Sequence, residues 1–339
     1  MKQTILVTGG SGYIGAWVVK GLVEKGYTVR VAVRNKSNTQ KYQHIIDLGN
    51  QNKGSVELWE ADLLVEHSFD EVAKGCDSII HLASPFTLNM DNPQKNLIDP
   101  ALKGTQNVLN AASKSETVKK IVLTSSIAAL FGDNVDLINQ NIEEINESHS
   151  NSTSSLAHQP YSYSKLLAEQ EAWKIHANQS QWNLVVINPG FVMGPGFTKN
   201  SSSGSIDFMK DILKGKFKMG APVLNFSFVD VRDIAIAHIK ALESTTAKGK
   251  YIITNEGMDV MSFTKLIEDA YPKQYKLPSM ISPKWLMMLI GPLFGVTRKF
   301  VKNNVGFPLK ISNAKSIKEL SMTYTPIKQS VIDMVEWLR

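Results

Sequence analysis

The chain has 339 residues, 43% of them hydrophobic and 20% charged, so it can bury a large core as one α/β unit with an appended lobe. Its single cysteine, Cys76, excludes an internal disulfide and fits a reducing, cytoplasmic location. The formal net charge is +6, but no dense Lys/Arg run with interleaved aromatic residues occurs, so we expect no nucleic-acid partner.

Short apolar runs alternate with helix-like segments in the first half of the chain. The expected strands are 4–9, 27–34, 55–63, 76–84, 118–126 and 183–190, and the expected helices are 13–26, 99–115 and 161–180. Such alternation is typical of a parallel sheet with helices on both faces. We therefore predict an α/β fold of the Rossmann type, with a doubly wound parallel sheet and a smaller C-terminal α/β lobe. The first apolar run is too short for a signal peptide, so none is expected.

Two polar segments interrupt this alternation: a long loop at 133–159, with room for one short helix, and a flexible loop at 198–205. After about residue 256 the alternation weakens. We predict a discontinuous organisation, with a dinucleotide-binding domain from 1–190 plus about 224–255 and a substrate-binding lobe from about 191–223 plus 256–339. Ligands of such folds bind at the carboxyl ends of the parallel strands.

The stretch "WLMMLIGPLFGV", 285–296, is strongly apolar but is interrupted by Gly-Pro. It falls short of the about 20 apolar residues that a spanning helix needs, so no membrane span is expected. We expect a buried or pocket-lining pair of helices here. Because the sequence that follows is basic, contact with a membrane surface or a partner is the alternative.

The turn after the first strand, "TGGSGYIG", carries Gly9, Gly12 and Gly15 as G-x-x-G-x-x-G. Glycines permit a tight turn, and they let backbone N–H groups at a helix N-terminus approach a pyrophosphate. The turn therefore predicts a dinucleotide site. The flanking residues included in this site are Thr8, Tyr13 and Ile14.

The end of the second strand indicates which dinucleotide binds. A carboxylate there favours NAD, whereas an arginine accommodates the 2′-phosphate of NADP. Arg34 holds this position, and Lys41 follows one or two turns later. A guanidinium can grip a phosphate through paired hydrogen bonds. We therefore predict NADP(H) as the cofactor, and we expect Asp62, at the end of the third strand, to accept from the adenine amino group.

The stretch "QPYSYSK", 159–165, contains two tyrosines that compete for a catalytic role. Tyr161 and Lys165 are four residues apart on a predicted helix, and such residues share a face. Tyr163 lies about 200° around the helix from Tyr161, so we expect it to pack elsewhere. The Lys165 ammonium and an oxidised nicotinamide would lower the pKa of Tyr161 from near 10, so that its phenol can exchange a proton with a carbonyl or alcohol oxygen.

The sequence context indicates roles for three further polar positions. Ser125 or Ser126, at the end of a strand, could hold a substrate oxygen by a hydrogen bond. His81 is interpreted as a packed strand histidine. The charged group in "VDVRD", 229–233, is interpreted as a helix cap with an ion pair that holds the two lobes together.

Seven segments resemble those of the extended short-chain dehydrogenase/reductases in order and approximate spacing: "TGGSGYIG", "ADL", "HLAS", "VLTSS", "YSYSK", "NPGFVMGP" and "FSFVDVRDIAIAHIKAL". The resemblance covers nearly the whole chain. Within this superfamily of NAD-dependent epimerases and dehydratases, the chain is most similar to the dihydroflavonol 4-reductase-like and aldehyde or carbonyl reductase branch. The cues for the branch are "YTVRVAVRNKSNTQK", "ASPF", "AEQEAWK" and "NAKSIKELSMTYTP".

This resemblance implies roles for the matching residues. Ser126, Tyr161 and Lys165 match the catalytic serine, tyrosine and lysine of the family. The residues that match cofactor contacts are Gly9, Gly12, Gly15, Arg34, Lys41, Asp62, Leu63, Leu82, Ala83, Ser84, Tyr161, Lys165, Pro189, Gly190 and Val192. The resemblance further implies that hydride passes from the nicotinamide to a carbonyl carbon while Tyr161 protonates the oxygen.

Two departures from the family bear on the substrate. Flavonoid reductases carry an asparagine a few residues after the catalytic serine, whereas this chain has Phe131 there, so we expect a more apolar carbonyl compound than a flavonoid. Cinnamoyl-CoA reductases carry a cysteine near their tyrosine that "HQPYSYSK" lacks. The expected pocket walls beside Ser126 are Phe86, Phe131, Met193 and Phe226.

Taken together, these features predict an NADP-dependent oxidoreductase that reduces an aldehyde or ketone to an alcohol. The alternatives are a nucleotide-sugar epimerase or dehydratase, a 3β-hydroxysteroid-type dehydrogenase and a non-catalytic NADP-binding regulator. We expect a small-molecule substrate and a monomer or homodimer. No metal is expected, because no His or Cys residues have the spacing of metal ligands.

Overall fold

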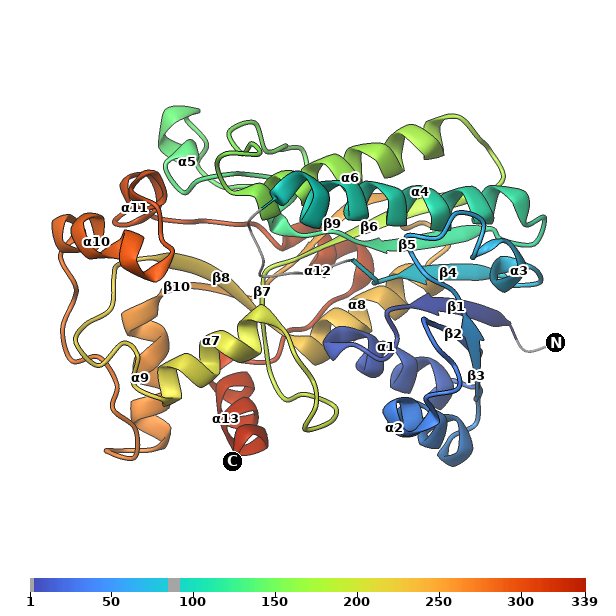
Figure 1. Ribbon diagram of the computed structural model, residues 1–339, viewed down its shortest axis with the longest axis horizontal. Coiled ribbons are helices and arrows are strands. Elements are labelled where there is room, and N and C mark those ends of the chain that lie inside the picture. Colours follow the sequence, from blue (N-terminus) through green and yellow to red (C-terminus); the bar gives the residue numbers. More distant parts are fainter. Residues whose placement is uncertain (1–2, 85–91) are drawn as a thin grey trace.

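The computed structural model describes residues 3–84 and 92–339. Its centre is a seven-stranded parallel sheet in the order β3-β2-β1-β4-β5-β6-β9 (Figure 1). The strands are β1 (Thr4–Thr8), β2 (Thr28–Val33), β3 (Ser55–Glu60), β4 (Ser78–His81), β5 (Lys120–Thr124), β6 (Asn183–Pro189) and β9 (Gly249–Ile253). Because the chain winds outward from β1 in one direction and then from β4 in the other, the predicted doubly wound Rossmann-type sheet is confirmed.

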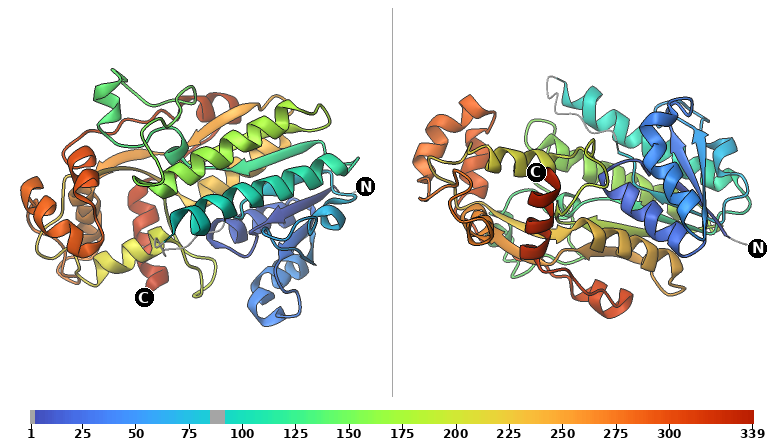
Figure 2. Two further views of the ribbon diagram at one scale, coloured as in Figure 1. Left: turned by 45° about the horizontal axis from the view of Figure 1, so that its top comes forward. Right: turned by 90° about the horizontal axis from the view of Figure 1, so that it is seen from below.

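Helices cover both faces of this sheet (Figures 1 and 2). One face carries α1 (Tyr13–Glu24), α2 (Thr39–Gln51), α8 (Val231–Glu243) and α12 (Ala314–Leu320), and the other carries α3 (Asp70–Ala73), α4 (Asp99–Lys114) and α6 (Pro160–Ala177). A π-helical turn, η1 (Gln94–Ile98), precedes α4. Ile5 and Val7 of β1 enter the first core and Leu6 enters the second, because successive side chains of a strand point to opposite faces.

A second sheet of three strands, β10-β8-β7, belongs to the smaller lobe. The strands are β7 (Phe191–Met193), β8 (Asn225–Asp230) and β10 (Glu256–Asp259), and the helices around them are α7 (Gly204–Leu213), α9 (Val260–Ala270), α10 (Lys284–Ile290), η3 (Gly291–Phe294), α11 (Arg298–Asn304) and α13 (Ile327–Leu338). Aromatic and aliphatic side chains from α7, α9 and α13 form its core. β8 falls within 224–255, which we assigned to the dinucleotide-binding domain, yet it pairs in the small sheet; the domain boundaries stay a prediction.

Charged side chains connect the two lobes. Asp230 caps α8 by accepting from the backbone N–H of Arg232 at 2.7 Å. The Arg232 guanidinium contacts Asp230 and also Asp333 of α13, at 2.7 Å each. The interpretation of this group as a helix cap with an ion pair between the lobes is therefore confirmed.

The apolar stretch 285–296 differs from expectation. α10 has no buried residue, and its Trp285 is 67% exposed, so the prediction of a buried or pocket-lining helix pair is wrong for this segment. Hydrophobicity predicts that a segment prefers burial, but the available cores here are filled by other elements. Among the helices in the described ranges, none has the length and apolarity required to cross a bilayer.

The long loop 133–159 lies between η2 (Ile127–Ala129) and the start of α6. It contains one short helix, α5 (Asp136–Asn139), as expected. Its residue Ile145 bridges to Ile311, far along the chain. The loop thus contacts the C-terminal part of the molecule, beside the helix that carries Tyr161.

Candidate active site

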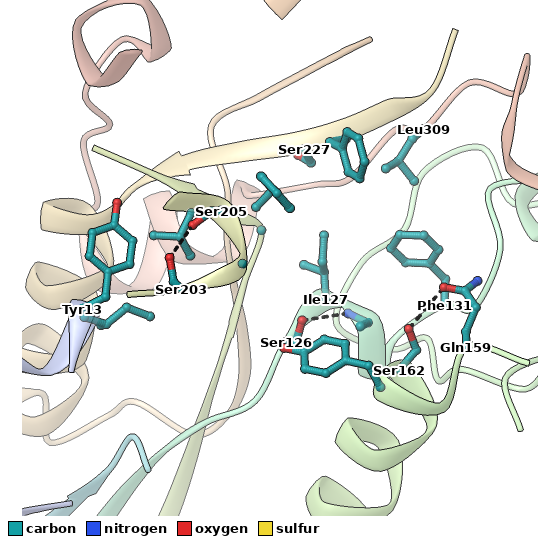
Figure 3. Close-up of a pocket in the computed structure, with 18 of the residues that line it drawn as sticks. Tyr13, Ser126, Ile127, Phe131, Gln159, Ser162, Ser203, Ser205, Ser227 and Leu309 are labelled. Carbon is teal, nitrogen blue, oxygen red and sulfur yellow. Dashed lines mark hydrogen bonds between the residues drawn. The ribbon is translucent and has the colours of Figure 1, made fainter. Parts of the chain in front are cut away.

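A cavity of about 520 Å³ lies at the carboxyl ends of β1, β5 and β6 and extends to the small sheet. Ser126 lies between Tyr13, near one end, and Gln159 and Phe131, near the other (Figure 3). The residues predicted from sequence that line this cavity are Gly9, Gly12, Tyr13, Ile14, Gly15, Leu82, Ser126, Phe131, Tyr161, Gly190, Val192 and Phe226. Segments far apart in the sequence therefore meet at one site, where ligands of such folds bind.

The glycine turn packs tightly against the start of α1. Gly9 has a φ of +70°, which glycine adopts without strain. A Cβ on Gly15 would stand 2.0 Å from the carbonyl oxygen of Gly9, so a side chain there would force the turn and the helix apart. Gly12 precedes α1, and no side chain caps this helix. The first-turn N–H groups therefore point to where a phosphate can accept from them, which fits the pyrophosphate of a dinucleotide.

The two cations predicted to contact the 2′-phosphate lie outside this cavity. Arg34 directly follows β2 and is exposed, and Lys41 is exposed in the first turn of α2. Glu60 at the end of neighbouring β3 accepts from the backbone N–H of Lys36 at 3.2 Å. That carboxylate is therefore engaged by the backbone, and both cations face solvent.

Asp62 and Leu63, the predicted adenine contacts, follow β3. The Asp62 carboxylate accepts from the N–H of Leu64 at 2.9 Å and so stabilises a local turn. Asn107 of α4 donates to the carbonyl oxygen of Leu63 at 2.8 Å. Neither Asp62 nor Leu63 lines the 520 Å³ cavity, so their predicted contacts would belong to a more distant part of a bound dinucleotide.

Thr8 lies beneath the glycine turn rather than in the cavity. Its hydroxyl forms a 2.7 Å hydrogen bond with Nδ1 of His81 and accepts from the N–H of Ala83 at 3.1 Å. Burial lowers the pKa of His81 to about 3, so the ring is neutral at physiological pH. The interpretation of His81 as a packed strand histidine is confirmed. Ala83 and Ser84 line a separate small pocket together with Lys165.

Residues 189–192 connect the two sheets. Pro189 ends β6, and the N–H of Gly190 donates to the carbonyl oxygen of Ile253 at 2.9 Å. A Cβ on Gly190 would lie 2.4 Å from the carbonyl oxygen of Ser227 in β8, so only glycine lets the two sheets approach here. Gly190 and Val192 consequently form a wall of the cavity.

Ser126 and Tyr161 line the cavity, whereas Lys165, one turn after Tyr161 on α6, lines the separate small pocket. Ser126 ends the turn after β5 and caps η2, where its hydroxyl accepts from the N–H of Ala128 at 3.2 Å. A hydrogen bond also joins Ser126 to the Tyr161 phenol. The Lys165 ammonium stands 5.8 Å from the centre of the Tyr161 ring. Ser126 lines the cavity, whereas Ser125 lines only the small pocket with Lys165.

The helical spacing separates the two tyrosines as expected. Tyr161 lies in the first turn of α6 and lines the cavity. Tyr163, two residues on, is partly buried and is not among the residues that line either described pocket.

The expected lowering of the Tyr161 pKa is not seen in the protein by itself. The surrounding protein removes water from the Tyr161 phenol and so raises its pKa, and the hydrogen bond with Ser126 opposes this rise. The residue as a whole is 37% exposed, because it lines the cavity. Burial lowers the pKa of Lys165 to about 8, so its positive charge is partly lost just above neutral pH. In the protein by itself, the raising effect of burial on the Tyr161 pKa therefore outweighs the lowering effect of the hydrogen bond with Ser126.

Sequence reasoning missed Asn188, which supports the serine. Its amide donates to the backbone oxygen of Ser126 at 3.0 Å and to the carboxylate of Glu169 at 2.8 Å. Glu169 lies one turn after Lys165 on α6 and pairs with Lys250 at 3.4 Å. Asn188 thus ties the turn that carries Ser126 to the helix that carries Tyr161. The available signal was an asparagine in the otherwise apolar strand "LVVINP".

Aromatic side chains form the walls on the side of the small lobe. Phe191 and Phe226 lie 5.1 Å apart, centre to centre, and Phe131 faces the same cavity. Met193 is fully buried in the core of the lobe and is not among the cavity-lining residues, so its prediction as a pocket wall is wrong: other core side chains cover it. Phe86 lies outside the described residues.

Further lining residues had no sequence signal. These are Asn134, Gln159, Leu224, Asn225, Phe300, Asn304 and Leu309, together with serines of the 202–205 segment. The walls are therefore aromatic and aliphatic, with a few amide and hydroxyl groups between them.

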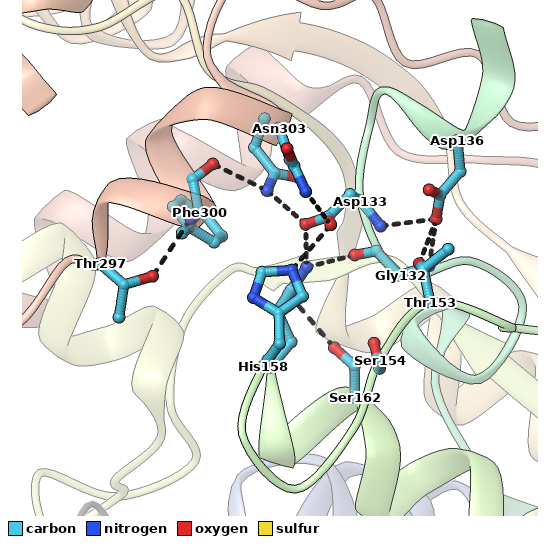
Figure 4. Close-up of polar contacts among 12 residues, drawn as sticks. Gly132, Asp133, Asp136, Thr153, Ser154, His158, Ser162, Thr297, Phe300 and Asn303 are labelled. Carbon is cyan, nitrogen blue, oxygen red and sulfur yellow. Dashed lines mark hydrogen bonds and ion pairs between the residues drawn. The ribbon is translucent and has the colours of Figure 1, made fainter. Parts of the chain in front are cut away.

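A buried carboxylate, Asp133, organises the polar end of the cavity (Figure 4). It accepts from Nε2 of His158 at 2.7 Å, from the Gln159 amide at 2.6 Å, and from the amides of Asn303 and Asn304 at 2.8 and 2.6 Å. Three of these donors lower the pKa of Asp133 against the opposing effect of burial, first Asn303, then His158 and Asn304. The end of the long loop, directly before α6, and the end of α11 are thereby held by one side chain.

Gln159 occupies a strained position in this cluster. Its φ of +55° is uncommon for a residue with a side chain, and it directly precedes α6. Its amide donates to Asp133 and to the carbonyl oxygen of Gly132. These bonds hold the backbone conformation from which the helix with Tyr161 begins, so Asp133 acts as a positioning residue for the catalytic end of α6.

Asp133→Asn is expected to lower the free energy of unfolding by about 3 kcal/mol at pH 7. The new amide would lose the negative charge and would direct its own N–H group at side chains that now donate hydrogen bonds to the carboxylate. The folded pKa of Asp133 is depressed, so this stabilisation exists above the unfolded pKa of about 3.9 and is lost as pH falls through the folded value. Urea unfolding at several pH values should therefore give curves of the two proteins that converge in acid.

The matched control is Asp47→Asn, at a partly exposed carboxylate that accepts from the Gln43 side chain four residues away. It should change stability by less than about 0.5 kcal/mol. An effect of Asp133→Asn no larger than this control would contradict the organising role of Asp133.

The chain matches the model of the "NAD dependent epimerase/dehydratase family" over residues 5–256. It is 32% identical to cinnamoyl-CoA reductase CAD2 of Medicago truncatula, over 100% of this chain and 96% of the relative. It is also 32% identical to dihydroflavonol 4-reductase of Arabidopsis thaliana, over 82% of this chain and 72% of that protein. Among solved structures, Gre2 of Candida albicans in complex with NADPH aligns with a TM-score of 0.80 at 31% identity, covering 99% of this chain and 98% of Gre2.

Proposed function

The chain belongs to the NAD dependent epimerase/dehydratase family, and from this membership we propose that it is an NADPH-dependent reductase that converts an aldehyde or ketone to an alcohol. The observation that carries the proposal is the juxtaposition of Ser126 and Tyr161 in a cavity that also contains the glycine turn, with the Lys165 ammonium 5.8 Å from the centre of the Tyr161 ring. Cinnamoyl-CoA and dihydroflavonol reductases are among the relatives, and a similar protein is solved with NADPH, which supports the same class of chemistry.

The chain's residues fit NADPH at two points. The first-turn N–H groups of α1 bind the pyrophosphate, which approaches closely because Gly9, Gly12 and Gly15 have no side chains. Arg34 and Lys41 bind the 2′-phosphate through charge-assisted hydrogen bonds. When bound, NADPH supplies the hydride for the carbonyl carbon.

The chain's own groups then handle the carbonyl oxygen. The hydroxyls of Ser126 and Tyr161 hydrogen-bond to this oxygen and stabilise the negative charge that develops on it. Tyr161 gives its proton to the oxygen, and the alcohol forms. The Lys165 ammonium, 5.8 Å from the Tyr161 ring, stabilises the phenolate that is left. Asn188 holds the backbone of Ser126 in place for these steps.

The cavity walls favour an apolar carbonyl compound. Phe131, Phe191 and Phe226 offer aromatic surface, whereas the amides of Asn134 and Gln159 offer a few polar contacts at one end. A small molecule of this kind is the proposed substrate. We further propose that the protein acts in the cytoplasm as a monomer or homodimer, without nucleic acid as a partner.

Oxidation of NADPH, followed by absorbance, tests the proposal on aldehydes, α-ketoesters, aryl ketones, steroids and dihydroflavonols. We expect turnover with NADPH for at least one apolar aldehyde or ketone, and a much lower kcat/KM with NADH. Denaturation of the purified protein serves as a second measurement. Release of tightly held NAD, with no turnover on any carbonyl compound, would contradict the proposal and favour an epimerase or dehydratase.

A further inference from the structure

The α10–η3–α11 hairpin stands at the end of the smaller lobe, away from β2 and β3 at the other end of the molecule (Figures 1 and 2). Large apolar side chains of this region are unusually exposed, at 55 to 83% each. They are Met219, Met280, Ile281, Trp285, Leu289 and Leu293, and we call them the apolar tip. Single exposed apolar residues are ordinary, but a contiguous group marks an interaction surface.

The members of the apolar tip lie next to one another. The N–H of Ala221 donates to the carbonyl oxygen of Met280 at 3.1 Å, which brings the turn with Met219 beside Met280 and Ile281. Trp285 and Leu289 are four residues apart on α10 and share one of its faces. Leu293 follows four residues later in η3. The exposed side chains therefore form a continuous stripe.

The charge of the segment that carries most of this stripe has one sign. No aspartate or glutamate occurs from residue 270 to 318, whereas the same stretch holds nine lysines and arginines. Arg298, Lys299 and Lys302 are exposed on α11, and Arg298 donates to the carbonyl oxygen of Met288 on α10 at 3.2 Å. Within the described part of the chain, none of these three cations is in an ion pair.

This combination of exposed apolar and unpaired basic side chains indicates what binds to the apolar tip. A second copy of the chain would bring a second set of unpaired cations against the first, which is unfavourable. Exposed Trp and aliphatic side chains beside unpaired Lys and Arg are instead typical of segments that lie in a membrane interface, where clustered cations bind anionic headgroups. We propose that the apolar tip docks on an anionic lipid bilayer, with Trp285 and Leu289 in the headgroup region and the α11 cations at lipid phosphates.

Docking of the apolar tip would also determine where the cavity lies relative to the bilayer. α11 carries Phe300 and Asn304, which line it, so one short helix belongs both to the cavity wall and to the basic flank of the apolar tip. A bilayer that holds α11 would therefore hold the cavity close to compounds dissolved in lipid. The docking itself does not rest on the proposed function.

Flotation of the full chain with lipid vesicles tests this inference. With vesicles of phosphatidylcholine and about 30% phosphatidylserine, we expect at least about tenfold more bound protein than with phosphatidylcholine alone. Binding should fall when the salt concentration is raised to about 1 M, because charges at the surface are then screened. Equal recovery with both kinds of vesicle would overturn the proposal.

Two double variants separate the apolar and electrostatic contributions. Trp285→Ser/Leu289→Ser and Lys299→Gln/Lys302→Gln should each lower the affinity for anionic vesicles by about tenfold or more. All four side chains lie outside the cavity lining, so NADPH binding and thermal unfolding should match the wild type. Unchanged vesicle binding in both variants would contradict the proposal.

Matched controls change the same residue types elsewhere on the surface. Ile236→Ser/Ile317→Ser replaces exposed aliphatic residues of α8 and α12, and Lys103→Gln/Lys119→Gln removes two exposed cations near the large sheet. Both should bind anionic vesicles like the wild type. A loss in the lysine control equal to that of Lys299→Gln/Lys302→Gln would show that net charge alone drives binding and would overturn the assignment to the tip. Sedimentation that shows self-association through Trp285, without vesicle binding, would overturn it in favour of a dimer.

Discussion

Tyr161→Phe is expected to lower kcat for carbonyl reduction by about 10²- to 10⁴-fold, because the phenol supplies the proton to the carbonyl oxygen in the transition state. The change removes one oxygen atom and keeps the ring that lines the cavity. The Kd for NADPH should therefore change by less than about twofold. Single-turnover NADPH oxidation at saturating cofactor, together with fluorescence titration of NADPH, measures the two quantities separately.

Tyr163→Phe is the matched control for this prediction. It removes the same atom from the same helix, two residues away, at a side chain that is not among those lining the cavity. Its kcat should equal that of the wild type. If both variants lost activity to the same extent, the helix as a whole rather than the Tyr161 hydroxyl would be responsible, and the assignment of Tyr161 would fail.

Arg34→Gln is expected to raise KM for NADPH by about 10- to 100-fold, because it removes charge-assisted hydrogen bonds to the 2′-phosphate worth about 1.5–3 kcal/mol. The kcat/KM for NADH should stay within about threefold, since NADH has no phosphate at this position. The side chain is exposed, so the fold should tolerate the change. Steady-state kinetics with both cofactors on one substrate gives the ratio directly.

Lys20→Gln controls for the loss of one positive charge. Lys20 is a partly exposed residue of α1 that pairs with Glu24 at 3.0 Å, and no cofactor contact is assigned to it. It should leave the ratio of NADPH to NADH efficiency unchanged. Equal losses with NADPH and NADH in Arg34→Gln would mean that Arg34 does not recognise the 2′-phosphate.

Contacts between close neighbours in the sequence were predicted well. Gly9, Gly12 and Gly15 belong to one turn between a strand and a helix, and Tyr161 and Lys165 are separated by a single helical turn. Such features depend on short-range geometry, which the residue order specifies almost alone. The alternation of apolar runs likewise predicted the central sheet, since parallel strands buried on both faces read as short apolar runs.

Contacts between distant segments were not predictable in this way. Asp133 and Asn303 are 170 residues apart, and no local pattern links them. The support of Ser126 by Asn188 across 62 residues is of the same kind. The residue type of Met193 suited a pocket wall, but side chains from distant parts of the chain bury it in the core of the lobe.

The sequence by itself determined the class of fold, the nucleotide-binding turn and the tyrosine that shares a face with a lysine, because each of these follows from local spacing and hydrophobic period. Only the tertiary structure decided which side chains wall the cavity, and that Trp285, Leu289 and Leu293 of the apolar segment 285–296 stay exposed. Apolar side chains are more stable when they are buried, but the packing of distant elements determines which apolar surfaces are covered and which stay exposed to solvent.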